Sequence, residues 1–126
     1  MEKIQVEGAG LPVGHYSHGI VHNGFVFVSG QLPWDLFTRE IENGSIEAQT
    51  ELALKNVEAV LRQAGTDLNH VVQMTIYISD IELWGKVNEV YACILGEHRP
   101  ARAIVPVKDL HFDTKIEIQA IAAVKD

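Results

Sequence analysis

Two kinds of side-chain periodicity alternate along this chain, and their order strongly limits the folds open to it. Apolar side chains recur at the period of an amphipathic helix in residues 45–64 and 80–95. Alternating or β-rich runs predict strands in the remaining segments, which are residues 4–6, 19–22, 25–29, 71–79, 100–107 and 116–124. The order β-β-β-α-β-α-β-β predicts an α+β fold with one mixed sheet, in a single domain spanning residues 1–126.

The boundaries of both helices have clear signals. Ser45 and Asp80 are side chains that cap helix N-termini, and Gly65 and Gly96 stand where a helix ends in the left-handed conformation. Right-handed crossovers then place both helices on the same face of the sheet. On the strand between them, that face is expected to carry Val72, Met74, Ile76 and Ile78.

The second face of the sheet is left without a helix. It is expected to carry Ile104, Ile121 and Ala123 together with Arg102 and Glu117. A face of mixed apolar and charged side chains is usually buried against another subunit. The pattern therefore predicts an obligate oligomer whose sites lie where subunits meet.

Arg102 and Glu117 are the main candidates for chemistry, because each is a charged side chain that projects from a strand among small apolar neighbours. One interpretation is a structural ion pair, or two solvated side chains. The other is a site that binds a carboxylate through the guanidinium fork, with an acid/base group beside it. The pattern of residues leaves both open.

Four further positions are weaker candidates. Tyr16 offers a hydroxyl from a glycine-rich loop, Ser29 and Gly30 end a strand, and Asn88 lies among inward residues of the second helix. Simple packing explains Tyr16 equally well, and a position on the helix surface explains Asn88 equally well. An ordinary strand-to-loop turn is the favoured interpretation of Ser29 and Gly30. Cys93, the one cysteine, is expected to be a small core residue and not a nucleophile.

Composition narrows the classes of function. The formal net charge of −7 argues against non-specific binding of nucleic acid, which relies on lysine and arginine. The absence of a signal peptide and of an apolar run of roughly 20 residues predicts a cytoplasmic protein that does not enter a membrane.

His15, His18 and His22 are not spaced to converge on a metal, and no glycine-rich phosphate loop is present. Neither a metal nor a cofactor is expected.

The closing segment carries a family resemblance. Pro-Ala-Arg-Ala-Ile-Val-Pro-Val-Lys-Asp-Leu, five further residues and then Ile-Glu-Ile resemble the C-terminal signature of the reactive-intermediate deaminase family, called RidA or YjgF. Weaker matches follow the family's order over nearly the whole chain. They are Gly14-His15-Tyr16-Ser17, residues 27–31, Gln49-Thr50, residues 54–57, and Val87-Asn88 with Tyr91.

The resemblance implies a chorismate-mutase-like fold assembled as a homotrimer, with sites in the clefts between subunits. It also implies hydrolysis of reactive 2-enamino and 2-imino acids, such as 2-aminoacrylate and 2-iminobutanoate, to 2-keto acids and ammonia. In that activity Arg102 would hold the substrate carboxylate and Glu117 would position water and transfer protons. The pocket would be shaped by Tyr16, Ser29, Gly30 and Asn88.

Three positions depart from the family pattern. Ile104 stands where many members have a cysteine, two residues after the arginine, so the resemblance implies that Ile104 would be the substrate contact there. Gln119 replaces a common glutamate, and residues 34–37, Trp-Asp-Leu-Phe, replace a proline- and glycine-rich turn. Two alternatives to the deaminase remain: a trimer that binds 2-keto or 2-imino acids without turnover, and a ribonuclease, against which the negative charge weighs.

Overall fold

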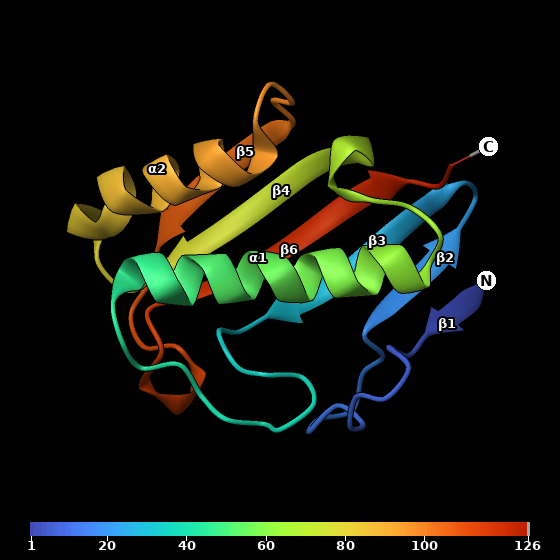
Figure 1. Cartoon of the computed structure of the whole chain (residues 1–126), viewed down its shortest axis with the longest axis horizontal. Coiled ribbons are helices and arrows are strands. Elements are labelled where there is room, and N and C mark those ends of the chain that lie inside the picture. The colour runs from blue at the N-terminus through green and yellow to red at the C-terminus, as the bar shows by residue number, and fades with distance from the viewer. Residues whose placement is uncertain (126) are drawn as a thin grey trace.

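The computed structural model describes residues 1–125. It contains one six-stranded sheet in the order β1-β2-β3-β6-β4-β5, in which β4 and β5 are parallel and the other pairs are antiparallel. Both helices cover the same face of this sheet (Figure 1), so the predicted α+β architecture is confirmed. The strands are β1 Glu2–Ile4, β2 Gly19–His22, β3 Phe25–Gln31, β4 Val71–Ile78, β5 Ala101–Pro106 and β6 Ile116–Ala123. The helices are α1 Ile46–Gln63 and α2 Trp84–Leu95, with short turns of 3-10 helix at Leu68–His70, Ile81–Leu83 and His111–Asp113.

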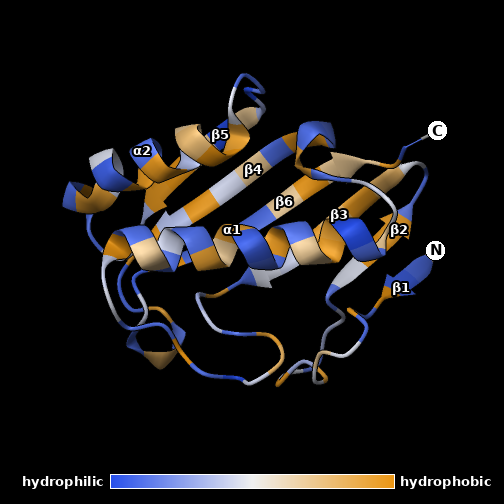
Figure 2. Ribbon diagram, in the orientation of Figure 1, coloured by the Kyte–Doolittle hydropathy of each residue, from blue (hydrophilic) through white to orange (hydrophobic). Residues whose placement is uncertain are grey.

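Helix α1 begins and ends at the predicted signals. The Ser45 hydroxyl accepts a hydrogen bond from the Ala48 amide at 3.1 Å, and Gly65 follows the helix with a φ of +84°. Leu54 and Val57 of its apolar stripe are fully buried against the sheet, and Figure 2 shows polar and apolar residues alternating along the helix. Neither this helix nor any other within residues 1–125 is long and apolar enough to cross a membrane.

Helix α2 follows the 3-10 turn that Asp80 caps, and Gly96 ends it with a φ of +63°. Val87 and Tyr91 face the core. Cys93 is exposed, so the expectation that it packs in the core is wrong. Cys93 is two residues away from each of the buried residues Tyr91 and Leu95, so the helical turn directs it to the outer surface.

The core lies between the helices and one face of the sheet. Met74, Ile76 and Ile78 of β4 are fully buried there, beside alternate residues of β6 and β3: Ile116, Ile118, Ala120, Ala122, Val26 and Val28. The opposite face has no covering layer within the described residues. Phe25, Phe27 and Val105 are 41%, 43% and 37% exposed, and the strand register places them on this open face.

The start of β4 departs from simple alternation. Val71 is 1% exposed and Val72 is 43% exposed, the reverse of the predicted inward position of Val72. The register with β6 shifts between Val71 and Gln73, so an extra residue is inserted at this point. A bulge of this kind flips the side chains on one side of it, and a period-two pattern does not reveal it.

Candidate functional site

Arg102 projects from β5 toward helix α2. Its Cα pairs in register with that of Met74, which is fully buried under the helices. The Arg102 Nη1 atom donates a hydrogen bond of 2.8 Å to Asn88 Oδ1, and the guanidinium lies 4.8 Å from the centre of the Tyr91 ring. The Trp84 ring lies 5.5 Å away. One amide oxygen and two aromatic faces of α2 therefore fix the direction of the guanidinium.

The Arg102 guanidinium has no acidic partner among residues 1–125. No carboxylate of residues 1–125 lies within 4.0 Å of it, since the ion pairs in that part of the chain involve other cations. It lines a hollow of about 540 Å³ together with Asn88, Tyr91, His98 and Pro100. A guanidinium fork held in place with free donors is suited to bind a small carboxylate.

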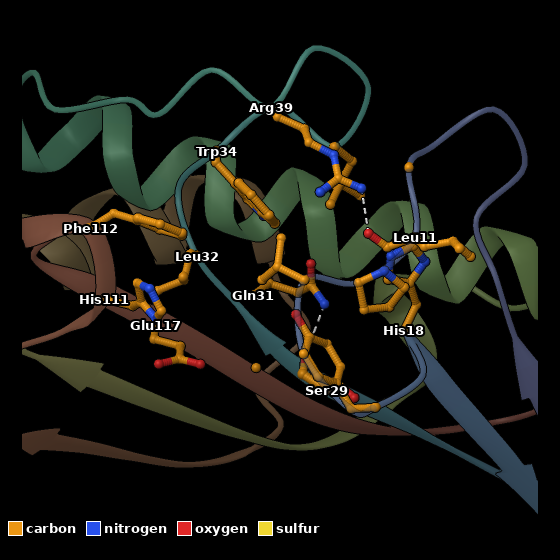
Figure 3. Close-up of a pocket in the computed structure, with 17 residues that line it drawn as sticks. Leu11, His18, Ser29, Gln31, Leu32, Trp34, Arg39, His111, Phe112 and Glu117 are labelled. Atoms are coloured by element: carbon orange, nitrogen blue, oxygen red, sulfur yellow. Dashed lines mark hydrogen bonds between the residues drawn. The ribbon is translucent and has the colours of Figure 1, made fainter.

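Glu117 lies in a different cavity. It occupies the position on β6 that pairs with Tyr77 of β4, on the open face of the sheet. Figure 3 shows this second cavity, of about 520 Å³, into which the Glu117 carboxyl projects. The loop before β2 contributes Tyr16 to its lining, and the end of β3 contributes Ser29 and Gly30.

Gly30 makes room for the Glu117 carboxyl. A methyl group placed on Gly30 would overlap Glu117 Oε2 and lie 3.0 Å from Cδ, so only glycine lets the carboxyl lie against the β3 backbone. Burial raises the pKa of the Glu117 carboxyl above its ordinary value, and the charge of nearby His111 partly opposes that shift. Burial, followed by the charge of Glu117, likewise raises the pKa of the Tyr16 hydroxyl. A carboxyl with a raised pKa in a cleft is a candidate acid/base group.

Ser29 holds the loop that carries Tyr16. Its hydroxyl donates a hydrogen bond of 2.6 Å to the Ser17 carbonyl, and its amide donates to the His18 carbonyl at 3.0 Å. The hydroxyl proton is thus engaged with the backbone, and the hydroxyl oxygen remains an acceptor toward the cavity.

The structure corrects the expectation that Arg102 and Ile104 share the open face with Glu117. The parallel register of β5 on β4 aligns Ile104 with buried Ile76, and Ile104 packs against the core on the helix side. The site residues therefore fall into two groups on opposite faces. Arg102, Asn88 and Ile104 form one, and Tyr16, Ser29, Gly30 and Glu117 form the other.

Arg39 is a residue of the Glu117 cavity that the sequence did not reveal. Its Nη2 donates a hydrogen bond to the Leu11 carbonyl, and its guanidinium lies 5.8 Å from the centre of the Trp34 ring. Trp34 in turn stacks on Phe112, with ring centres 5.7 Å apart. Residues 34–44 have neither helical nor strand periodicity, so the sequence contains no indication that Arg39 lies at a cavity wall.

Metal ligands are not grouped in residues 1–125, where no three histidine, cysteine, aspartate or glutamate side chains lie together. The residues in the two cavities instead combine a fixed guanidinium, a carboxyl with a raised pKa and several hydroxyls. A guanidinium is suited to bind a small anion, and a carboxyl with a raised pKa is suited to transfer protons.

The two helices over one face of a mixed sheet, with these two cavities, define a small α+β protein of the chorismate-mutase-like RidA fold. The chain belongs to the RidA/YjgF family. The family model described as Endoribonuclease L-PSP matches residues 7–124. Among similar proteins, a RutC family protein of Pyrococcus horikoshii is 46% identical over 121 residues, which cover 96% of this chain and 96% of that protein.

Solved structures agree with this assignment. A putative endoribonuclease of Thermotoga maritima superposes with a TM-score of 0.93 at 38% identity, covering 100% of this chain and 99% of that one. The crystal structure of E. coli TdcF with bound serine superposes with a TM-score of 0.92 at 34% identity, covering 99% of this chain and 100% of that one. A putative regulator, AldR of Lactococcus lactis, is 36% identical and covers 99% of both chains.

Proposed function

We propose that this protein hydrolyses reactive 2-enamino and 2-imino acids to 2-keto acids and ammonia, as 2-iminobutanoate and 2-iminopropanoate deaminases do. The observation that carries the proposal is the position of Arg102, whose guanidinium is fixed by Asn88 yet has no carboxylate partner within residues 1–125. A substrate carboxylate is the partner that this geometry fits. Membership of the RidA/YjgF family supports a deaminase role.

The complete site would form between subunits. Within one chain Arg102 and Glu117 lie on opposite faces of the sheet, and the open face exposes Phe25, Phe27 and Val105. When the open face of one copy packs against the β5 edge of the next, Glu117 of the first can meet Arg102 of the second. A head-to-tail contact of this kind forms a closed ring when the rotation between copies closes, and the proposed ring is a homotrimer with three equivalent sites.

In the proposed reaction Arg102 binds the substrate carboxylate through two parallel hydrogen bonds, and Asn88 keeps the guanidinium oriented. Glu117 accepts a proton from a water molecule, whose oxygen attacks the imine carbon. The carboxyl returns that proton to the nitrogen, which gives a tetrahedral carbinolamine. Glu117 then takes the proton of the new hydroxyl group and passes it to the nitrogen, so that the carbon–nitrogen bond breaks, ammonia leaves and the carbonyl forms. No electron is exchanged with a cofactor, because the imine carbon is already electrophilic.

The environment of Glu117 suits both proton transfers. Its raised pKa makes the carboxylate a stronger base than an exposed glutamate and the carboxylic acid easier to form. Tyr16 and Ser29 line the same cavity and offer hydroxyl groups to the attacking water or to the nitrogen. Because such imines also hydrolyse in water, correct positioning of the reactants accounts for most of the acceleration required.

Binding without turnover is the second candidate. The serine bound to E. coli TdcF and the regulator name of AldR support a role in capturing small amino or keto acids. This candidate requires Arg102 as well, so only measured turnover separates it from the deaminase. The ribonuclease suggested by the family description fits a chain of net charge −7 poorly.

A coupled assay tests the proposal. Threonine dehydratase generates 2-iminobutanoate, and semicarbazide traps the imine that remains. The deaminase predicts slower formation of the trapped adduct when wild-type protein is present, and no such effect with Arg102→Ala at the same oligomeric state. Equal adduct formation with and without the wild-type protein would contradict it, and binding of 2-oxobutanoate would then support the capture function.

A further inference from the structure

A second guanidinium lines the cavity that holds the Glu117 carboxyl. In Figure 3 Arg39 and Glu117 lie at opposite ends of this cavity, with the Trp34 ring next to Arg39. No carboxylate of residues 1–125 lies within 4.0 Å of the Arg39 guanidinium, which donates one hydrogen bond to the Leu11 carbonyl. Donors of Arg39 therefore remain free for an anion in the cavity.

A closed turn of the backbone holds Arg39 in the cavity lining. Asp35 Oδ1 accepts hydrogen bonds from the amides of Phe37 and Thr38 at 2.8 and 2.9 Å, and the Asp35 carbonyl accepts one from the Arg39 amide at 2.8 Å. Arg39 itself has a φ of +66°, a conformation that costs free energy in a residue other than glycine. A closed turn thus maintains a strained residue whose side chain enters the cavity.

Gly10 makes room for the Arg39 guanidinium, as Gly30 does for the Glu117 carboxyl. A methyl group placed on Gly10 would lie only 2.7 Å from Arg39 Nε and 2.8 Å from Cζ. Both charged side chains that line the cavity therefore lie against a glycine. This close packing fixes the guanidinium at one end of a cavity of about 520 Å³, which is larger than a three-carbon imino acid fills.

We propose that Arg39 binds a second carboxylate and that the preferred substrates are dicarboxylic 2-imino acids, such as those formed from aspartate and glutamate. This inference rests on the proposed function, in which the first carboxylate binds Arg102. The reaction is the same hydrolysis: water supplies the carbonyl oxygen, the carbon–nitrogen bond breaks, and nitrogen leaves as ammonia. The second carboxylate takes no part in bond making.

The charge of Arg39 determines which substrate side chains the cavity favours. Trp34, Leu36 and Phe112 also line it and would accept an apolar side chain. An apolar occupant would, however, exclude water from the Arg39 guanidinium without replacing the lost hydrogen bonds, which is unfavourable. A side-chain carboxylate satisfies the guanidinium, while its methylene groups contact the aromatic pair.

The test compares two imines that differ only in the terminal group. Amino-acid oxidases convert glutamate to 2-iminoglutarate and norvaline to 2-iminopentanoate, in which a methyl replaces the carboxylate. The wild-type kcat/KM is expected to favour 2-iminoglutarate, and Arg39→Gln is expected to lower the ratio of the two values about 10- to 100-fold. Gly10→Ala, which displaces the guanidinium but keeps its charge, is expected to lower the ratio in the same direction.

Arg62→Gln is the matched control, because it removes the same charge from an exposed ion pair on α1 and should keep the wild-type ratio. A wild-type preference for 2-iminopentanoate, or an equal ratio in wild type and Arg39→Gln, would overturn the inference. Calorimetric measurement of the binding of 2-oxoglutarate and 2-oxopentanoate tests the role of Arg39 separately from the proposed deaminase activity. Arg39-dependent preference for 2-oxoglutarate without any turnover would contradict the deaminase and support the role of Arg39.

Discussion

Arg102 and Glu117 project from opposite faces of one sheet, although their strands β5 and β6 flank the same strand, β4. Arg102 is in register with buried Met74, whereas Glu117 is in register with Tyr77, three residues further along β4. An odd separation on a strand reverses the face. The two groups therefore belong to separate half-sites of one chain, and the predictions below follow from this separation.

Loss of the Arg102 guanidinium is expected to remove substrate binding without unfolding the protein. Arg102→Ala deletes two charged hydrogen bonds to the substrate, so kcat/KM for 2-iminobutanoate should fall by at least about 100-fold, or about 3 kcal/mol. Arg102→Lys should recover only part of the loss, because an ammonium lacks the planar fork. Circular dichroism and light scattering check that fold and assembly persist; unchanged turnover would contradict the role.

Asn88 is expected to act through Arg102, as a positioning residue. Asn88→Ala removes the 2.8 Å hydrogen bond that orients the guanidinium while leaving its charge in place. We expect KM for the imine to rise about tenfold, with a smaller change in kcat. Combining Asn88→Ala with Arg102→Ala should add no further loss, since the amide would have nothing left to orient; additive losses would contradict this account.

Gly30→Ala is expected to disturb the chemistry more than the fold. The added methyl displaces the end of the Glu117 side chain, which can move, so the melting temperature should change little. The kcat should nevertheless fall at least about tenfold, because the base no longer reaches the water. Gly85→Ala in helix α2 is the control, since nothing lies within 4 Å of its added methyl and alanine favours a helix by about 0.5–1 kcal/mol.

The acid limb of the pH–rate profile should report Glu117. Burial raises its pKa, and the base works as the carboxylate, so kcat is expected to fall as pH decreases through a value above that of a free glutamate. The same shift destabilises the folded protein above the folded-state pKa and has no effect below the unfolded-state pKa. Glu117→Gln should therefore raise the free energy of unfolding at pH 7 and leave it unchanged near pH 4. A stability gain confined to acidic pH would contradict the assigned shift.

Much of the fold followed from local chemistry. Ser45, Asp80, Gly65 and Gly96 mark helix ends through hydrogen bonding and backbone freedom that act within a few residues. Such signals are readable before any tertiary contact is known. The order of elements then restricted the architecture to two helices on one face of the sheet.

Three features depended on contacts that a linear pattern does not contain. The bulge between Val71 and Gln73 inverted the expected face of Val72. The face of Arg102 was set by the register of β5 on β4, which the alternation within β5 leaves undetermined. Arg39 reaches its cavity from an irregular loop, through a turn closed by Asp35.

Hybrid oligomers test whether Arg102 of one chain and Glu117 of another form one site. Arg102→Ala and Glu117→Gln chains are each expected to be inactive, and carry different affinity tags so that mixed trimers can be purified after co-expression. Each mixed trimer joins one intact Arg102 to one intact Glu117 across an interface, so the account predicts about one third of the wild-type kcat per trimer. Mixed trimers as inactive as their parents would contradict a site shared between subunits.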